Sequence, residues 1–302
     1  MDALPAELIH QILELLCTDA SDPFRFRAVA VTTPGQLVSL LDAFTQSSPL
    51  AKASMRHLFM VVHKESTEAG SYILQRTSHT LETLTCLIED SGASVDQTII
   101  WTTFPRLTAL TLRYRIYPYY FFIFGGPPES IPTLPNLRYL HVAQERLENI
   151  HAVHRTMDLF ARRTGGRLER ARVSSVIVGE ASIRSLQEIL SFGTVGGAPP
   201  VPASLRYYVI ELDSVARWWS QPESQVTDRL VDLKRWAEEQ GVVQLIILPS
   251  SRTYEKTPEM WKEEWLQVQS GAVDRVAEWL DTMHGTASVA SPDSSGGVQV
   301  LE

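Results

Sequence analysis

Apolar residues recur along most of the chain in groups of three, in which the second residue follows the first by three positions and the third by five. The two clearest examples are FPRLTALTL (104–112) and LPNLRYLHV (134–142), which begin 30 residues apart. Successive groups begin 26, 26, 30, 31, 37 and 37 residues apart, so they form a loose internal repeat. The units are Met55-Leu58-Met60, Leu81-Leu84-Cys86, Leu107-Leu110-Leu112, Leu137-Leu140-Val142, Leu168-Ala171-Val173, Leu205-Tyr208-Ile210 and Val242-Leu245-Ile247.

Each unit predicts a short β-strand. Its last two apolar residues are two positions apart, so they lie on the same face of a strand. Three connecting segments, at 149–163, 180–190 and 226–241, have the apolar spacing of helices. Strands and helices that alternate at a nearly constant period favour an α/β fold, an irregular solenoid of parallel short strands alternating with helices. The alternative is an ordinary two-layer α/β domain whose strands happen to look alike.

The first residues, MDALPAELIHQILELL, predict a short amphipathic helix. The apolar residues recur at helical spacing and form one broad stripe, and Pro5 and Glu7 suit the first turn of a helix. The helix serves either as a cap over the first unit, since repeat arrays need their ends covered, or as a binding element.

The same segment resembles the first helix of an F-box, and the order of a helix followed by repeats resembles fungal F-box proteins with degenerate leucine-rich-like repeats. The resemblance covers a truncated F-box, because residues 20–37 read as a turn, a short strand and a turn. It implies that this helix binds the Skp-family adaptor of cullin–RING ubiquitin ligases, and that the repeats hold a protein substrate. The adaptor-binding residues would be Leu4, Pro5, Leu8, Ile9, Ile12 and Leu13.

The repeats depart from leucine-rich repeats at one position. That family usually places Asn or Cys three residues after the last leucine of the strand, where the side chain hydrogen-bonds the loop. No unit has either residue there, so we expect a degenerate array without this polar ladder. The residues present are His63, Glu89, Arg115, Glu145, Val176, Asp213 and Ser250.

These patterns divide the chain into four expected parts. Residues 1–20 are the truncated F-box-like helix, and residues 21–254 are the degenerate leucine-rich-like α/β repeats. Residues 255–285 are terminal helices that cap the array, and residues 286–302 are polar enough to predict a disordered tail.

Residues that alternate with the strand leucines are expected to point into the concave face of the array, with Phe59 and Thr85 in its first units. In the middle units this face combines arginines with aromatic residues, a composition enriched at protein interfaces. The stretch 154–172 concentrates positive charge and would suit an acidic or phosphorylated partner segment, unless its arginines pair with Asp158, Glu169 and neighbouring acids. These arginines are Arg155, Arg162, Arg163, Arg167, Arg170 and Arg172. The candidate partner-binding residues are Arg113, Tyr139, His141, Arg170, Arg172, Tyr207 and Glu211.

Composition and motifs narrow the function further. The net charge of −8 argues against a general nucleic-acid binder, and the apolar stretch 117–126 is too short to span a membrane. The sequence has no phosphate-binding loop, no nucleophile elbow and no Cys-x-x-Cys pair, so we expect no catalytic residues, metal or cofactor. We expect a non-enzymatic protein-recognition module of the cytoplasm or nucleus. The alternative is a repeat scaffold that has lost adaptor binding and acts outside the ubiquitin system.

Overall fold

The computed structural model describes residues 27–46, 55–90, 95–115, 133–144, 160, 163–176, 204–213, 223–240, 243–251 and 256–269. Several expected elements lie outside these residues, namely the F-box-like helix at 1–20, the helix at 180–190, most of the helix at 149–163, and the tail. Within the described part of the chain, no helix has both the length and the apolar character needed to cross a bilayer.

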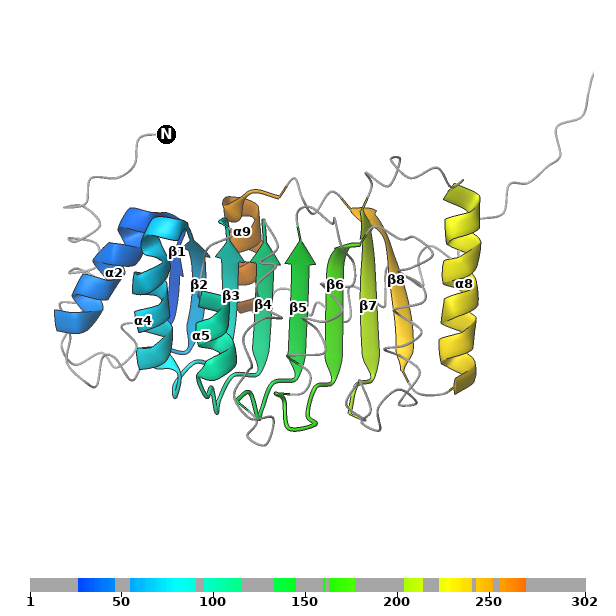
Figure 1. Ribbon diagram of the computed structural model, residues 1–302, viewed down its shortest axis with the longest axis horizontal. Helices are drawn as coiled ribbons and strands as arrows, with labels where there is room; N and C mark the ends of the chain where they lie inside the picture. The colour runs from blue at the N-terminus through cyan, green and yellow to red at the C-terminus, as the bar shows by residue number, and fades with distance from the viewer. Residues whose placement is uncertain are drawn as a thin grey trace, which may run out of the picture. The chain divides into compact units, whose positions relative to one another are not determined.

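An open, all-parallel sheet of eight strands forms the centre of an α/β fold (Figure 1). The strands lie side by side in chain order, from β1 to β8. Parallel neighbours cannot be joined by a hairpin, so each connection crosses over the sheet. The strands are β1 (Ala28–Val31), β2 (His57–Val62), β3 (Thr83–Ile88), β4 (Ala109–Tyr114), β5 (Tyr139–Gln144), β6 (Arg170–Val176), β7 (Tyr207–Asp213) and β8 (Gln244–Ser251).

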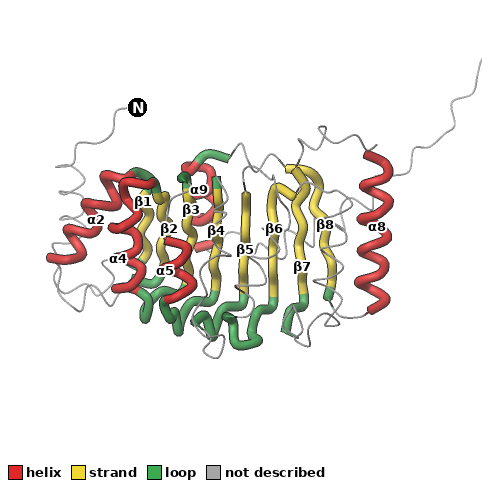
Figure 2. The backbone as a smooth tube through the Cα atoms, in the orientation of Figure 1, coloured by secondary structure: helices red, strands yellow, loops and turns green. Residues whose placement is uncertain are grey.

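Helices follow several of the strands (Figure 2). The helix predicted over 226–241 is confirmed as α8, with bounds that differ by a few residues. The described helices are α2 (Pro34–Gln46), the short 3-10 helix η1 (Lys64–Ser66), α4 (Thr67–Thr77), α5 (Val95–Trp101), α8 (Glu223–Gln240) and α9 (Pro258–Gln269).

The register of the sheet follows the sequence repeat. The second residue of each unit lies opposite the second residue of the next, from Leu58 on β2 to Leu245 on β8. The third residues align in the same way, from Met60 to Ile247. The seven strands expected from the repeat are therefore present, and equivalent repeat positions are direct neighbours in space.

The hydrophobic core lies on the face of the sheet that carries these repeat residues. The row that runs through the second residue of each unit is buried, and side chains from α2, α4, α5 and α8 join the same cluster. Because successive residues of a strand point to opposite faces, the residues between the repeat positions lie on the other face. The members of the row are Leu58, Leu84, Leu110, Leu140, Ala171, Tyr208 and Leu245.

Helix α2 was not predicted, although the sequence carries a signal for its start. Thr33 is followed by a proline at the first helical position and by Gln36, the pattern of a capping box. The Gln36 backbone N–H donates to Thr33 Oγ1 at 3.3 Å, and Gln36 Oε1 accepts from the Thr32 backbone N–H at 2.8 Å. The helix then buries Leu37, Leu40 and Phe44 in the core.

Contacts divide the chain into two compact units, Met1–Met260 and Trp261–Glu302. The first unit contains the sheet and the helices up to α8. The described part of the second unit is the remainder of α9. The candidate site described next lies entirely within the first unit.

Candidate functional site

The seven candidate partner-binding residues lie on the sheet face opposite the core, on four adjacent strands, β4 to β7. We call this surface the polar face. Register brings residues that are far apart in sequence into contact, because Tyr139, Arg170 and Tyr207 are direct neighbours on β5, β6 and β7. The prediction that these residues share one face is therefore met by the geometry.

A stacked row of Tyr139, Arg170 and Tyr207 crosses the polar face. The guanidinium carbon of Arg170 lies 5.1 Å from the ring centroid of Tyr139 and 5.3 Å from that of Tyr207. Both distances fall within the range of a cation–π contact. Tyr139 is 37% exposed, and the other two side chains are partly exposed, so the row is open to solvent.

A buried charged network lies beside this row. Arg172 Nη2 donates to Glu211 Oε2 at 2.6 Å, and the Ser174 hydroxyl donates to the same oxygen at 2.5 Å. The Ser174 oxygen also lies 2.7 Å from His141 Nε2. Since the hydroxyl proton is directed to Glu211, His141 is the donor to Ser174. Ser174 thus links the His141 imidazole to the Glu211 carboxylate.

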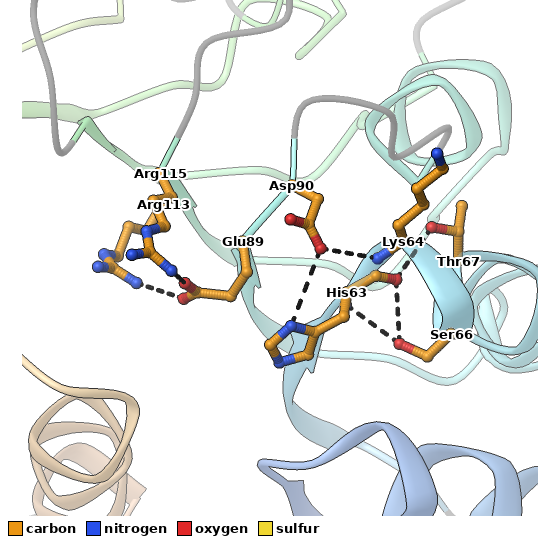
Figure 3. A network of polar contacts seen from close by, with 8 residues as sticks. All are labelled: His63, Lys64, Ser66, Thr67, Glu89, Asp90, Arg113 and Arg115. Atoms are coloured by element: carbon orange, nitrogen blue, oxygen red, sulfur yellow. Dashed lines mark hydrogen bonds and ion pairs between the residues drawn. The ribbon is translucent and has the colours of Figure 1, made fainter.

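A second ion-pair network lies where strands β2, β3 and β4 end (Figure 3). Glu89 Oε1 accepts from Arg113 Nη1 at 2.6 Å, and Arg115 Nη1 lies 3.5 Å from the other oxygen of the same carboxylate. Asp90, which follows Glu89 in the turn after β3, accepts from the Lys64 backbone N–H through Oδ2 at 3.0 Å. The same oxygen lies 3.9 Å from His63 Nδ1.

This second network occupies the repeat position at which leucine-rich repeats carry Asn or Cys. The residues at that position are His63, Glu89 and Arg115, which directly follow β2, β3 and β4. They lack the family's side chains, yet they tie neighbouring turns together by charge and hydrogen bonding. Polar contacts therefore link the ends of the first three repeat strands.

Burial separates the candidate residues into two groups. Tyr139, Arg170 and Tyr207 are accessible, as expected for a binding face. Arg113, His141 and Glu211 are buried, at 5, 7 and 3% exposure, and Arg172 is close to that state. The alternative in which arginines of 154–172 pair with acids thus describes Arg172, and Arg113 is paired with Glu89 in a similar way. Phe59 and Thr85, expected on the same face, are buried as well.

Two residues that complete these networks, Glu89 and Ser174, were not predicted from the sequence to pair with the candidate residues. Glu89 lies just after β3, and Ser174 follows Arg172 by two positions on the same face of β6. Because alternate residues of a strand share a face, the sequence alone could have placed Ser174 next to Arg172 among the candidate residues. The partner of Arg113 could be found only by knowing the register between β3 and β4.

The groups with the largest pKa changes lie on the core side. Burial raises the pKa of Asp96 to about 7, although hydrogen bonds from backbone N–H groups, including that of Gln97 at 2.7 Å, act in the opposite direction. Burial, followed by the charge of Asp96, also raises the pKa of the Cys86 thiol. A thiol that is harder to ionise is a poor nucleophile and metal ligand, so Cys86 is a core residue.

The described residues contain no group of three or more His, Cys, Asp or Glu side chains placed to hold a metal ion. Comparison of the chain with protein-family models, with curated proteins and with solved structures found no match. What the fold and the site define is a class of architecture: an open parallel α/β sheet with an arginine- and tyrosine-bearing face.

Proposed function

We propose that this protein is a non-catalytic protein-recognition module that binds its partner on the polar face. The observation that carries the proposal is the convergence of the seven candidate residues on four adjacent strands. Arginine and tyrosine are the side chains most often responsible for binding energy at protein interfaces. Adjacent strands in register present these side chains at regular intervals across the sheet, which suits an extended segment of a partner protein.

We further propose that the sheet is a degenerate leucine-rich-like array. The in-register stacking of equivalent repeat residues supports this view, as does the match of each of the seven sequence units to one strand, from β2 to β8. Each unit is one strand and its return connection, and it buries its apolar residues against the units on either side. A series of such units provides a continuous face for a protein ligand.

The resemblance of residues 1–20 to an F-box supports a role in substrate selection for a cullin–RING ubiquitin ligase, in the cytoplasm or nucleus. In this proposal the apolar stripe binds the Skp-family adaptor, and the polar face holds the substrate. The stripe residues lie outside the described part of the chain.

One structural observation favours the alternative, a scaffold that acts without the adaptor. An F-box contains three helices, and here residues 28–31 and 34–46 form β1 and α2 of the sheet domain. Helix α2 buries three side chains in the common core. These residues therefore belong to the sheet domain and do not form the second and third helices of an F-box.

A binding experiment decides between the two. The purified full chain is mixed with a purified Skp-family adaptor, alongside the double variant Leu8→Asp, Ile12→Asp. A matched control, His10→Asp with Gln11→Asp, adds the same number of charges outside the apolar stripe. Binding that the control keeps and the stripe variant loses supports the ligase role. Absence of binding by the native chain refutes it and leaves the scaffold.

A further inference from the structure

We infer that Arg170, between Tyr139 and Tyr207, binds one carboxylate group of an acidic segment in the partner protein. The inference rests on the protein-recognition function proposed above and specifies the chemistry of the ligand. It concerns only the stacked row, which is the accessible part of the polar face.

The two tyrosine rings fix the position of the guanidinium group. Its central carbon is 5.1 Å from one ring centroid and 5.3 Å from the other, so it lies between two aromatic side chains held by rigid strands. Each ring attracts the cation through its negative face and so holds it in place. A guanidinium fixed in this way loses little entropy on binding, and its planar fork matches the two oxygens of a carboxylate.

Charge distinguishes Arg170 from its neighbours. Arg172 is paired with Glu211 at 2.6 Å, and Arg138 lies 3.9 Å from Glu169. Within the described residues, Arg170 has no carboxylate partner, and its contacts are the two rings. One cation of the polar face is therefore available to a ligand.

The surroundings favour an anion over a neutral ligand. The described residues of 133–144, 163–176 and 204–213 hold six arginines against three carboxylates, a net charge of +3 in a chain of net charge −8. Opposite charge across an interface steers association and selects partners. The arginines are Arg138, Arg163, Arg167, Arg170, Arg172 and Arg206, and the carboxylates are Glu169, Glu211 and Asp213.

The same arrangement favours a carboxylate over a phosphate group. A phosphate carries close to two negative charges, and its strong binding sites present clusters of arginines. Here the nearest arginine on the same face of β6, Arg172, is already neutralised by Glu211, and that carboxylate repels a dianion more than a monoanion. A single fixed guanidinium matches a single negative charge.

The test uses the full chain with carbon-13-labelled tyrosine and follows the ring signals of Tyr139 and Tyr207 by NMR. The probe is a short peptide of alternating glutamate and glycine, and the matched neutral peptide carries glutamine in place of glutamate. A third peptide replaces the central glutamate with phosphoserine. The signals are assigned from Tyr139→Phe and Tyr207→Phe, and circular dichroism confirms that every variant is folded.

The expected result is a saturable shift of both ring signals with the glutamate peptide and none with the glutamine peptide. Arg170→Met raises the dissociation constant about tenfold or more, and Arg170→Lys does not restore binding, because an ammonium group cannot form the planar fork. The control is Arg206→Gln, which removes an exposed arginine next to Tyr207 and is expected to change the constant by about twofold or less.

Three results would overturn the inference. The first is a loss of peptide binding in Arg206→Gln as large as the loss in Arg170→Met, which would mean that the peptide is held by the general positive charge of this surface. The second is full rescue by Arg170→Lys. The third is a phosphoserine peptide that binds through Arg170 about tenfold more tightly than the glutamate peptide. The peptide titration contains no adaptor, so its result does not depend on whether the chain binds the Skp-family adaptor. In the same way, the adaptor experiment does not depend on whether Arg170 binds a carboxylate.

Discussion

The carboxylate of Glu89 is shared by a buried arginine and an exposed one, so it allows the energetic effect of burial to be measured at a single site. The Arg113 and Glu89 side chains are 6 and 9% exposed, and their atoms are 2.6 Å apart. Arg115 is 57% exposed and lies 3.5 Å from the same carboxylate. We predict that Arg113→Met lowers the free energy of unfolding far more than Arg115→Met does.

The expected size follows from the two environments. Removing one member of a buried ion pair leaves the other charge buried, at a cost of about 3–5 kcal/mol. We expect Arg113→Met to lower the free energy of unfolding by about 3 kcal/mol, the lower end of this range, because Arg115 still interacts with Glu89. An exposed pair contributes about 0–1 kcal/mol, so Arg115→Met belongs in that range.

Urea denaturation followed by circular dichroism measures these free energies on the full chain. The double variant Glu89→Gln, Arg113→Met leaves neither charge in place, so its loss should be about 2 kcal/mol smaller than the sum of the two single losses. The reasoning is refuted if Arg115→Met destabilises the protein as much as Arg113→Met, or if the double variant shows simple additivity.

Three further substitutions test the core side of the sheet. The pKa of Asp96 is raised from 3.8 to about 7, so between these values the folded protein holds a proton that the unfolded chain releases. The free energy of unfolding should therefore fall by roughly 4 kcal/mol as the pH rises from about 4 to above 7. Denaturation curves of Asp96→Asn should lose this pH dependence. Gly70→Ala should raise the stability measured by thermal unfolding by about 0.5–1 kcal/mol, because alanine is favoured over glycine inside a helix such as α4. The added Cβ would meet Val62 and Val95 at 3.5 Å, which is an ordinary contact. A loss of stability would contradict this prediction. Leu140→Ala should cost about 2–5 kcal/mol in urea denaturation, because its side chain is 2% exposed in the repeat row, and a cost below about 1 kcal/mol would argue against that packing.

The strands could be predicted from the sequence because every unit repeats the same burial requirement. Two apolar residues two positions apart fit one face of a strand, and identical spacing in each unit allows one register across the sheet. Even Ala171 and Tyr208, which are poor matches to leucine, occupy the expected row. Position in the repeat determined their place more strongly than residue type did.

The helices were harder to predict from apolar spacing. Helix α8 was found because it is long and polar on its exposed side, whereas α2 is short and follows a strand closely. Its start was encoded in Thr33 and Gln36, two polar residues whose hydrogen bonds replace those missing at a helix N-terminus. Capping signals therefore carried information that hydrophobic periodicity lacked.

The division of the polar face into closed pairs and an open stack depends on register between distant units. Arg172 meets Glu211 across 39 residues and Arg113 meets Glu89 across 24, so no local pattern links either pair. In each pair the acid lies two residues beyond the arginine's direct neighbour on the adjacent strand, which is Leu87 for Arg113 and Val209 for Arg172. At the height of Arg170, both neighbouring strands supply tyrosine instead, which holds the guanidinium without neutralising it. Replacing Tyr207 with glutamate should therefore close the stack into another internal ion pair and abolish binding of the acidic peptide while leaving the fold intact.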